Sequence, residues 1–122
     1  MRLLDLKELK KLPKLNLAVV GHVEWMRFLS VDQLQKAGLI SHATKELQHP
    51  AGGAVLVAVQ MMELINTPVH LFTALGRDET GERSHEQLKN LGLKVSVAWR
   101  DKPTREGISF VDTQGERAIT VV

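Results

Sequence analysis

The hydrophobic pattern divides the chain into short strand-like runs and longer helical stretches. Continuous or alternating apolar runs predict strands at residues 17–20, 69–74, 95–99, 107–111 and 118–121. Two less regular runs, 25–34 and 43–48, are predicted to be extended and partly exposed, with a turn at Ala37-Gly38 between them. Residues 112–115 are rich in turn formers and are predicted to join the last two strands as a hairpin.

Residues 53–65 carry an ambiguous pattern. Val55, Val57 and Val59 alternate as in a strand, and valine is β-branched. The alanines, leucines and methionines around them favour a helix, and thirteen residues is long for a strand. We therefore predict a helix, and because it is apolar on nearly all sides we expect it to be buried.

A second helix is predicted before residue 92. Asp78 or Thr80 is expected to cap its start, Leu88 and Leu91 to form its inward face, and Gly92 to end it. Strands and helices then alternate along the chain, which predicts an α/β fold with a parallel sheet covered on both faces. Such sheets bind ligands at the carboxyl ends of their strands.

The N-terminal segment, residues 1–16, is predicted to be an amphipathic helical extension. Leucines recur at helical spacing over residues 3–12, and Pro13 ends the pattern. The lysines between them predict a solvated helix face, with a membrane-surface helix as the less favoured alternative. They are Lys7, Lys10, Lys11 and Lys14. Residues 17–122 are predicted to form the remaining domain.

Composition restricts the classes of function. The chain has 122 residues, 43% of them hydrophobic and 25% charged, which is ordinary for one globular domain. The net charge of +2 is too small to indicate nucleic-acid binding. No Cys is present, which excludes disulfides and thiolate metal sites and favours the cytoplasm. No apolar run is long enough to span a membrane, and the five histidines show no metal-ligand spacing, so we expect neither membrane insertion nor a metal site.

Two glycine-rich turns carry the candidate chemistry. Gly52 and Gly53 open the helix of residues 53–65, and bare N–H groups at a helix start can approach a polar ligand. The alternative is that these glycines only let the helix pack closely. Gly76 begins a second glycine-containing turn, residues 76–81, between a strand and the next helix. We expect both turns to face one small-molecule pocket.

The order of these glycine turns resembles the amino-terminal part of ribokinase-like (PfkB) carbohydrate kinases. The resemblance covers residues 17–122 and rests on the order and spacing of several short segments. They are Gly21, Ala51-Gly52-Gly53, the Gly76–Gly81 turn, Leu91-Gly92-Leu93, Pro103-Thr104, residues 107–112 and Gly115-Glu116-Arg117. It implies a partial, truncated doubly wound sheet with a small β lid, whose strands lie near residues 25–48 and 95–122.

The resemblance also implies a function. Members of the family transfer a phosphoryl group from ATP, with Mg²⁺, to a sugar or related small alcohol. The first half of these enzymes holds the substrate, and a Gly-Ala-Gly-Asp segment in the second half supplies the base and the anion hole. Residues 112–115 echo that segment only superficially, so no catalytic residue is expected in this chain. The isolated chain should be inactive and bind no nucleotide.

A second hypothesis is a non-catalytic module that binds sugar or dimerises. In the family, lid sheets commonly pair between subunits. A homodimer through the lid strands would cover edges that are otherwise open.

Some residues depart from the family pattern. Where many members carry hydroxyl-binding Asn and Asp after the first glycine, this chain has Glu24 and Met26. A carboxylate accepts hydroxyl hydrogen bonds, whereas the thioether of Met is at most a weak acceptor. Where many members carry Asn after the paired glycines, Leu56 or Val57 falls here. The site should therefore be more apolar than usual, which makes ribose an unsafe choice of substrate.

The candidate substrate-binding residues are Glu24, Gly52, Gly53 and Arg105. Glu24 is interpreted equally well as a hydroxyl acceptor or as an exposed loop acid. Arg105 can close over an anionic group, although a solvated turn arginine is the commoner outcome. For Asp78, a helix cap is the favoured interpretation and a ligand contact is the less favoured one.

Overall fold

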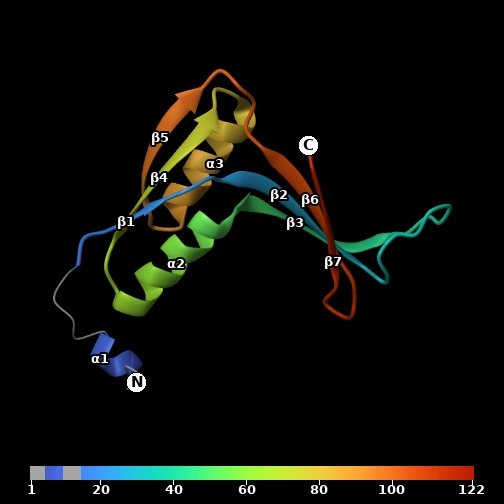
Figure 1. Ribbon diagram of the computed structural model, residues 1–122, viewed down its shortest axis with the longest axis horizontal. Coiled ribbons are helices and arrows are strands. Elements are labelled where there is room, and N and C mark those ends of the chain that lie inside the picture. Colours follow the sequence, from blue (N-terminus) through green and yellow to red (C-terminus); the bar gives the residue numbers. More distant parts are fainter. Residues whose placement is uncertain (1–4, 10–14) are drawn as a thin grey trace.

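The structure is a computed structural model that describes residues 5–9 and 15–122. A three-stranded parallel sheet carries two helices, and a separate four-stranded sheet extends from it (Figure 1). The parallel sheet has the order β1-β4-β5 and consists of β1 (Leu17–Val20), β4 (Val69–Gly76) and β5 (Lys94–Arg100). The helices that pack on it are α2 (Gly53–Ile65) and α3 (Glu79–Asn90).

The second sheet, which we call the lid sheet, has the order β3-β2-β6-β7. Its strands are β2 (Glu24–Val31), β3 (Ala43–Ala51), β6 (Glu106–Val111) and β7 (Arg117–Val121). The pairs β2–β3 and β6–β7 are antiparallel, whereas β2 and β6 are parallel. β2 follows β1 and β6 follows β5, and these two parallel strands end at the same end of the first sheet, which explains the parallel pairing of β2 with β6. The strand predicted at residues 95–99 was expected to belong to the lid, but these residues lie in β5 of the first sheet.

The predicted helix over residues 53–65 is confirmed as α2, despite its strand-like valines. Its expected burial is wrong in part. Val55 and Ala58 are buried, whereas Leu56 and Val57 are 59% and 49% exposed. The helix therefore packs through one stripe and leaves a second apolar stripe open.

The core lies on one face of the parallel sheet. Leu71 and Leu75 of β4 pack there against Val55 and Ala58 of α2 and Leu88 of α3. Strand order β1-β4-β5 progresses in one direction, and successive right-handed crossovers in one direction place their helices on the same face. The expected cover on both faces is therefore found on one face only within the described residues.

The other face of the parallel sheet carries exposed apolar side chains. Val20 is 81% exposed and Phe72 is 38% exposed. The imidazole of His70 on this face stacks on Phe72 at 4.1 Å and its Nε2 lies 2.7 Å from the Ser96 hydroxyl, so this histidine has its polar contact satisfied.

The start of α3 is tied to the β5–β6 connection by Asp78, as its predicted capping role requires. The carboxylate accepts hydrogen bonds from the Gly81 N–H (2.7 Å), the Thr104 N–H (2.6 Å) and the Thr104 hydroxyl (2.7 Å). The Thr104 hydroxyl in turn accepts from the Gly76 N–H at 2.9 Å. Burial by itself raises the pKa of Asp78, but the hydrogen bonds from Thr104 and Gly81 outweigh it and lower the pKa below its usual value. We call these residues the Asp78 network.

The far end of α3 differs from the prediction. Leu88 is fully buried as expected, but Leu91 is 48% exposed and lines a cavity described below. Gly92 follows with a φ of +94°, which confirms its predicted role as the terminator of the helix.

The N-terminal extension is described only in part. Residues 6–9 form α1 (Leu6–Leu9), which lies against α2, and the rest of the predicted helix over residues 3–12 lies outside the described residues. Within the part of the chain that the structure describes, no helix has the length and apolar character needed to cross a membrane.

Candidate functional site

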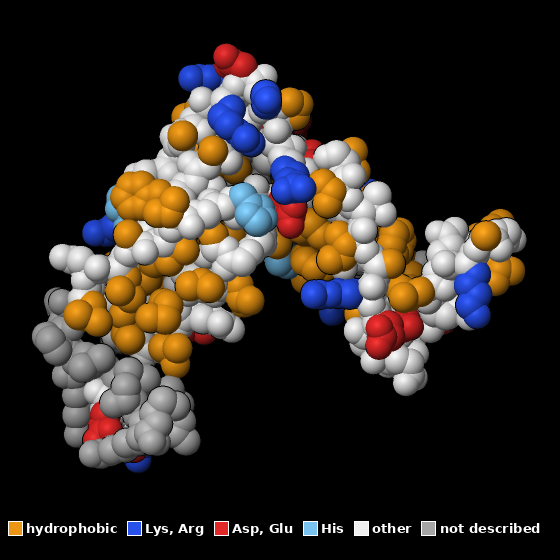
Figure 2. Space-filling view, in the orientation of Figure 1, with side chains coloured by type: hydrophobic (Ala, Val, Ile, Leu, Met, Phe, Trp, Pro, Cys, Tyr) orange, Lys and Arg blue, Asp and Glu red, His pale blue; other side chains and the backbone are white. Residues whose placement is uncertain are grey.

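A cavity of about 890 Å³ lies between the lid sheet and the two helices. Figure 2 shows the hollow between these two parts, with hydrophobic side chains on both sides of it. The lining side chains come from β2, β3, β7, the first two turns of α2 and the end of α3. They include Glu24, Met26, Phe28, His49, Gly52, Gly53, Leu56, Val59, Leu91, Arg117 and Ile119.

The start of α2 forms one end of this cavity. Gly52 has a φ of +120°, and a Cβ on it would lie 3.0 Å from the carbonyl oxygen of His22, so only glycine fits this bend. A Cβ on Gly53 would meet nothing within 4 Å. No side chain caps α2, so its first N–H groups have no capping partner. This end of the cavity therefore offers hydrogen-bond donors and the positive end of a helix dipole.

Glu24 lies beside this helix start. Its carboxylate lines the cavity, its side chain is 19% exposed, and its Oε2 lies 3.6 Å from the Nε of Arg105. Arg105 is more open, with 55% of its side chain exposed. It lines a second, smaller cavity of about 420 Å³ at the carboxyl ends of β1 and β4, together with Gly21, His22 and Arg100. The Glu24–Arg105 pair therefore stands between the two cavities.

Three of the four predicted site residues thus line one cavity, and Arg105 reaches it only through Glu24. The turn at Gly76 does not join them, which corrects the expectation that both glycine turns face one pocket. A Cβ on Gly76 would lie 2.5 Å from the Lys102 carbonyl oxygen and the Thr104 nitrogen. Gly76 is therefore required by close packing within the Asp78 network.

The remaining walls of the cavity are mostly apolar. Met26 is 4% exposed and lies over Gly107, where a Cβ would come within 2.6 Å of the Met26 sulfur. Phe28 stacks on the imidazole of His49 with ring centroids 4.9 Å apart. The His49 Nδ1 lies 2.9 Å from the Pro50 carbonyl oxygen, which can only accept, so Nδ1 is the protonated nitrogen of this ring.

Sequence reasoning missed Phe28, His49, Leu91 and Ile119 as lining residues. The signal for Phe28 was present, because residues 24, 26 and 28 alternate along one strand and so share one face. His49 lies opposite Met26 on β3, and this pairing register cannot be read from the pattern. Val57, the alternative to Leu56 in the sequence comparison, does not line the cavity, whereas Leu56 does.

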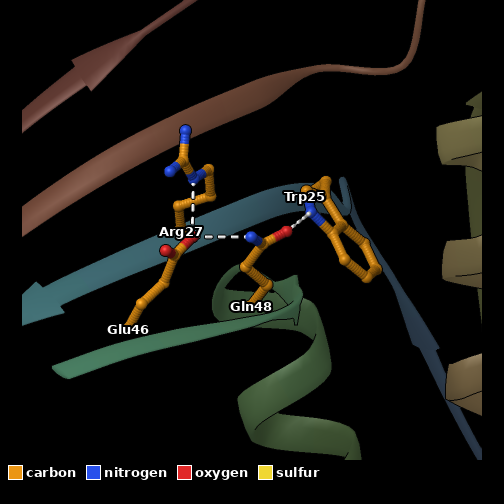
Figure 3. Close-up of polar contacts among 4 residues, drawn as sticks. All are labelled: Trp25, Arg27, Glu46 and Gln48. Carbon is orange, nitrogen blue, oxygen red and sulfur yellow. Dashed lines mark hydrogen bonds and ion pairs between the residues drawn. The ribbon is translucent and has the colours of Figure 1, made fainter.

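The opposite face of the lid sheet carries a chain of polar contacts (Figure 3). The indole N–H of Trp25 donates to Gln48 at 3.3 Å, and Gln48 donates to Glu46 at 2.6 Å. Arg27 also donates to Glu46, at 2.9 Å. The hydrogen bonds from Arg27 and Gln48 lower the pKa of Glu46. This chain joins β2 to β3 on the face away from the cavity.

Trp25 also connects the lid sheet to α3. It is 4% exposed, and the guanidinium of Arg83 lies 4.3 Å from the centroid of its ring. Its backbone N–H donates to the Arg105 carbonyl oxygen at 2.8 Å. Trp25 thus links β2 to α3 through the cation–π contact with Arg83 and to the β5–β6 connection through its backbone N–H.

Among residues 5–9 and 15–122, no three His, Asp or Glu side chains gather in a way that could hold a metal ion. The cavity lining contains Glu24 and Arg117 as its charged side chains and no lysine. The arrangement can therefore hold a neutral, hydroxyl-bearing molecule at its glycine end and an apolar group along its walls.

Comparison with known proteins gives one family match. A model described as "pfkB family carbohydrate kinase" matches residues 14–122. The search of curated protein sequences gave no significant match.

Solved structures with the same fold are ribokinases and related kinases. A candidate ribokinase from Agrobacterium tumefaciens superposes with a TM-score of 0.81 at 23% identity, covering 90% of this chain and 36% of that chain. Ribokinase from Giardia lamblia gives 0.77 at 16% identity, covering 87% of this chain and 33% of that chain. Ribokinase from Arabidopsis thaliana, solved with ribose and ATP, superposes with a TM-score of 0.65 at 22% identity, covering 90% of this chain and 36% of that chain. The chain thus spans about a third of the length of these structures.

Proposed function

Because the chain belongs to the pfkB family of carbohydrate kinases, we propose that it forms the part of such an enzyme that holds the acceptor sugar or related small alcohol. The predicted family is confirmed, as is the mixed α/β, ribokinase-like fold with a small β lid. The observation that carries the proposal is the large cavity beneath the lid sheet, which Glu24, Gly52 and Gly53 line together.

Each of these residues has a distinct proposed role. Glu24 accepts hydrogen bonds from two sugar hydroxyls, and Arg105, whose Nε lies 3.6 Å from the Glu24 Oε2, orients the carboxylate. The Gly53 N–H, at the uncapped start of α2, donates to a sugar oxygen. Gly52 supplies the bend that aims this N–H at the cavity. Arg105 also lies where it can approach an anionic group on the ligand.

We propose that the chain alone does not catalyse phosphoryl transfer. This reaction needs a base at the acceptor hydroxyl, anion-stabilising donors and a metal–nucleotide site. Ribokinases of similar fold have been solved with ADP or ATP, which supports nucleotide use by the family. The described residues do not fit these groups, because they offer neither an acidic cluster for Mg²⁺ nor a lysine in the cavity. We therefore assign no step through ATP or Mg²⁺ to this chain.

One observation favours a second function, a non-catalytic module that binds sugar or dimerises. The lid sheet presents half-exposed apolar side chains on its cavity face, including Leu47, Ile119 and Val121. Its edge strands β3 and β7 each pair on one side only. A second copy would cover both the apolar face and an open edge.

Calorimetric titration of the protein with ribose and other small polyols tests the proposed sugar site. We expect the Gly53→Val protein to stay folded, because the added side chain enters open space beside the helix start. Sugar binding should be abolished, because that space is part of the cavity and the side chain would keep the sugar away from the N–H. Gln60→Val, on an exposed turn of the same helix, serves as the matched control and should bind normally. Unchanged sugar binding by Gly53→Val would refute the role of its N–H. Sedimentation of the sugar-free protein tests the dimer.

A further inference from the structure

We infer that this cavity selects an acceptor that carries an aromatic or other apolar substituent over a bare pentose. The inference rests on the proposed sugar-holding function and names its substrate class more narrowly. It comes from the lining of the cavity, which is mostly apolar.

Most of the cavity lining is apolar, and its polar side chains are Glu24, His49, Gln87, Asn90 and Arg117. Glu24 and the N–H groups of Gly52 and Gly53 lie at the start of α2. The first side chains that follow on the same two elements and line the cavity are Met26 on β2 and Val55 and Leu56 on α2, all of them apolar. A bare pentose carries hydroxyls all around its ring. The hydroxyls that face Met26 and Leu56 would lose their hydrogen bonds to water without gaining new ones from the protein, which costs binding free energy.

Met26 cannot easily leave the wall. Its side chain is 4% exposed and lies on Gly107 of the neighbouring strand, which has no side chain to compete for that space. The wall at this point is thus a fixed thioether surface. It suits an apolar or aromatic group and offers no strong hydrogen bond to a hydroxyl.

The far walls extend this apolar surface. Phe28, stacked on His49, presents an aromatic ring from the lid sheet. Leu56 and Leu91 face the cavity from the helices and are 59% and 48% exposed, and Ile119 of β7 is 52% exposed. Half-exposed apolar side chains around a concave surface are typical of an interaction site, and we infer that the substituent of the acceptor covers them. At about 890 Å³ the cavity lies in the range that drug-sized molecules occupy.

The test compares three probes that share one sugar. They are D-ribose, methyl β-D-ribofuranoside and phenyl β-D-ribofuranoside, each titrated calorimetrically into the protein. We expect the phenyl riboside to bind about 10- to 100-fold more tightly than the methyl riboside, because its ring removes a large apolar area from water. The Leu56→Asn variant should lower this ratio by about fivefold or more, because a polar amide then faces the phenyl group.

Val57→Asn is the matched control. Val57 directly follows Leu56 on α2, is similarly exposed and does not line the cavity. This change should therefore leave the ratio of phenyl to methyl riboside affinity unaltered. Equal binding of the phenyl and methyl ribosides, with ribose still bound, overturns this inference and leaves the sugar-holding function intact. Binding of none of the three overturns both. If Leu56→Asn weakens self-association in sedimentation and leaves the ratio unchanged, a second copy covers the apolar wall and the inference is wrong.

Discussion

Replacing Asp78 by Ala tests whether the Asp78 network holds the start of α3 to the β5–β6 connection. The carboxylate accepts three hydrogen bonds of 2.6–2.7 Å, one from Gly81 at the start of α3 and two from Thr104, which is 4% exposed. Loss of the helix cap costs about 1 kcal/mol. Each hydrogen bond that Thr104 donates to the charged carboxylate contributes about 1.5 kcal/mol or more. Because the bonds form one network, we expect a combined loss of about 3–4 kcal/mol.

Urea unfolding followed by far-UV circular dichroism measures this loss. A decrease of about 3–4 kcal/mol is a large share of the roughly 5–15 kcal/mol that stabilises a typical protein, so the midpoint should fall clearly. Asp101→Ala is the control, since Asp101 is also acidic but has a 97% exposed side chain paired with Arg77 at 3.4 Å. A loss below about 1 kcal/mol for Asp78→Ala would refute the estimated strength of the network.

The same network predicts a pH dependence. Its hydrogen bonds lower the folded-state pKa of Asp78 below the ordinary value of 3.8. The unfolded state then binds the proton more readily, so the contribution of Asp78 is present above pH 3.8 and is lost as the pH falls through the folded-state pKa. The stability difference between the native protein and Asp78→Ala should therefore be constant near neutral pH and shrink in acid. A difference that does not change on acidification would contradict the lowered pKa.

Four further substitutions test other features by the same unfolding assay. Gly52→Ala should destabilise by about 1–3 kcal/mol because of its φ of +120°, whereas Gly53→Ala should not destabilise; equal effects would refute the distinction between these glycines. Gly107→Ala should cost about 1–3 kcal/mol, because its Cβ displaces the Met26 sulfur, and an unaltered stability would show that this wall yields freely. Glu46→Gln should leave stability nearly unchanged, because the ion pair with Arg27 is exposed; a clear loss would assign the polar chain of Figure 3 a larger role.

Local features of the fold followed from the sequence because they depend on neighbouring residues. The length and composition of residues 53–65 outweighed the alternating valines, since tertiary packing accepts valine in a helix whose apolar stripe is buried. The Asp78 cap and the 112–115 turn were also predicted, and the turn closes with a hydrogen bond from the Gly115 N–H to the Asp112 carbonyl oxygen. Caps and turns satisfy backbone groups locally, which leaves a local signal.

Features that depend on strand order were not predictable from the pattern. The order β1-β4-β5 places both helices on one face, and nothing in the periodicity of residues 69–74 specifies the neighbour of that strand. The same limit applies to the site. Gly52 and Gly53 were predicted from the chemistry of glycine at a helix start and Glu24 from its place in the family pattern, and all three line the cavity. Gly76 was assigned to the pocket wrongly, because a glycine required by close packing looks the same in sequence.

The lid sheet is assembled from two distant parts of the chain, and this has a kinetic consequence. Residues 24–51 supply β2 and β3, residues 106–121 supply β6 and β7, and the joining contact is the parallel pairing of Trp25 with Glu106. Closing so long a loop is entropically costly until α2, β4, α3 and β5 have shortened it. In a stopped-flow refolding experiment on a Trp99→Phe variant, which leaves Trp25 as the single tryptophan, the fluorescence should therefore reach its native value after the helical circular dichroism signal does.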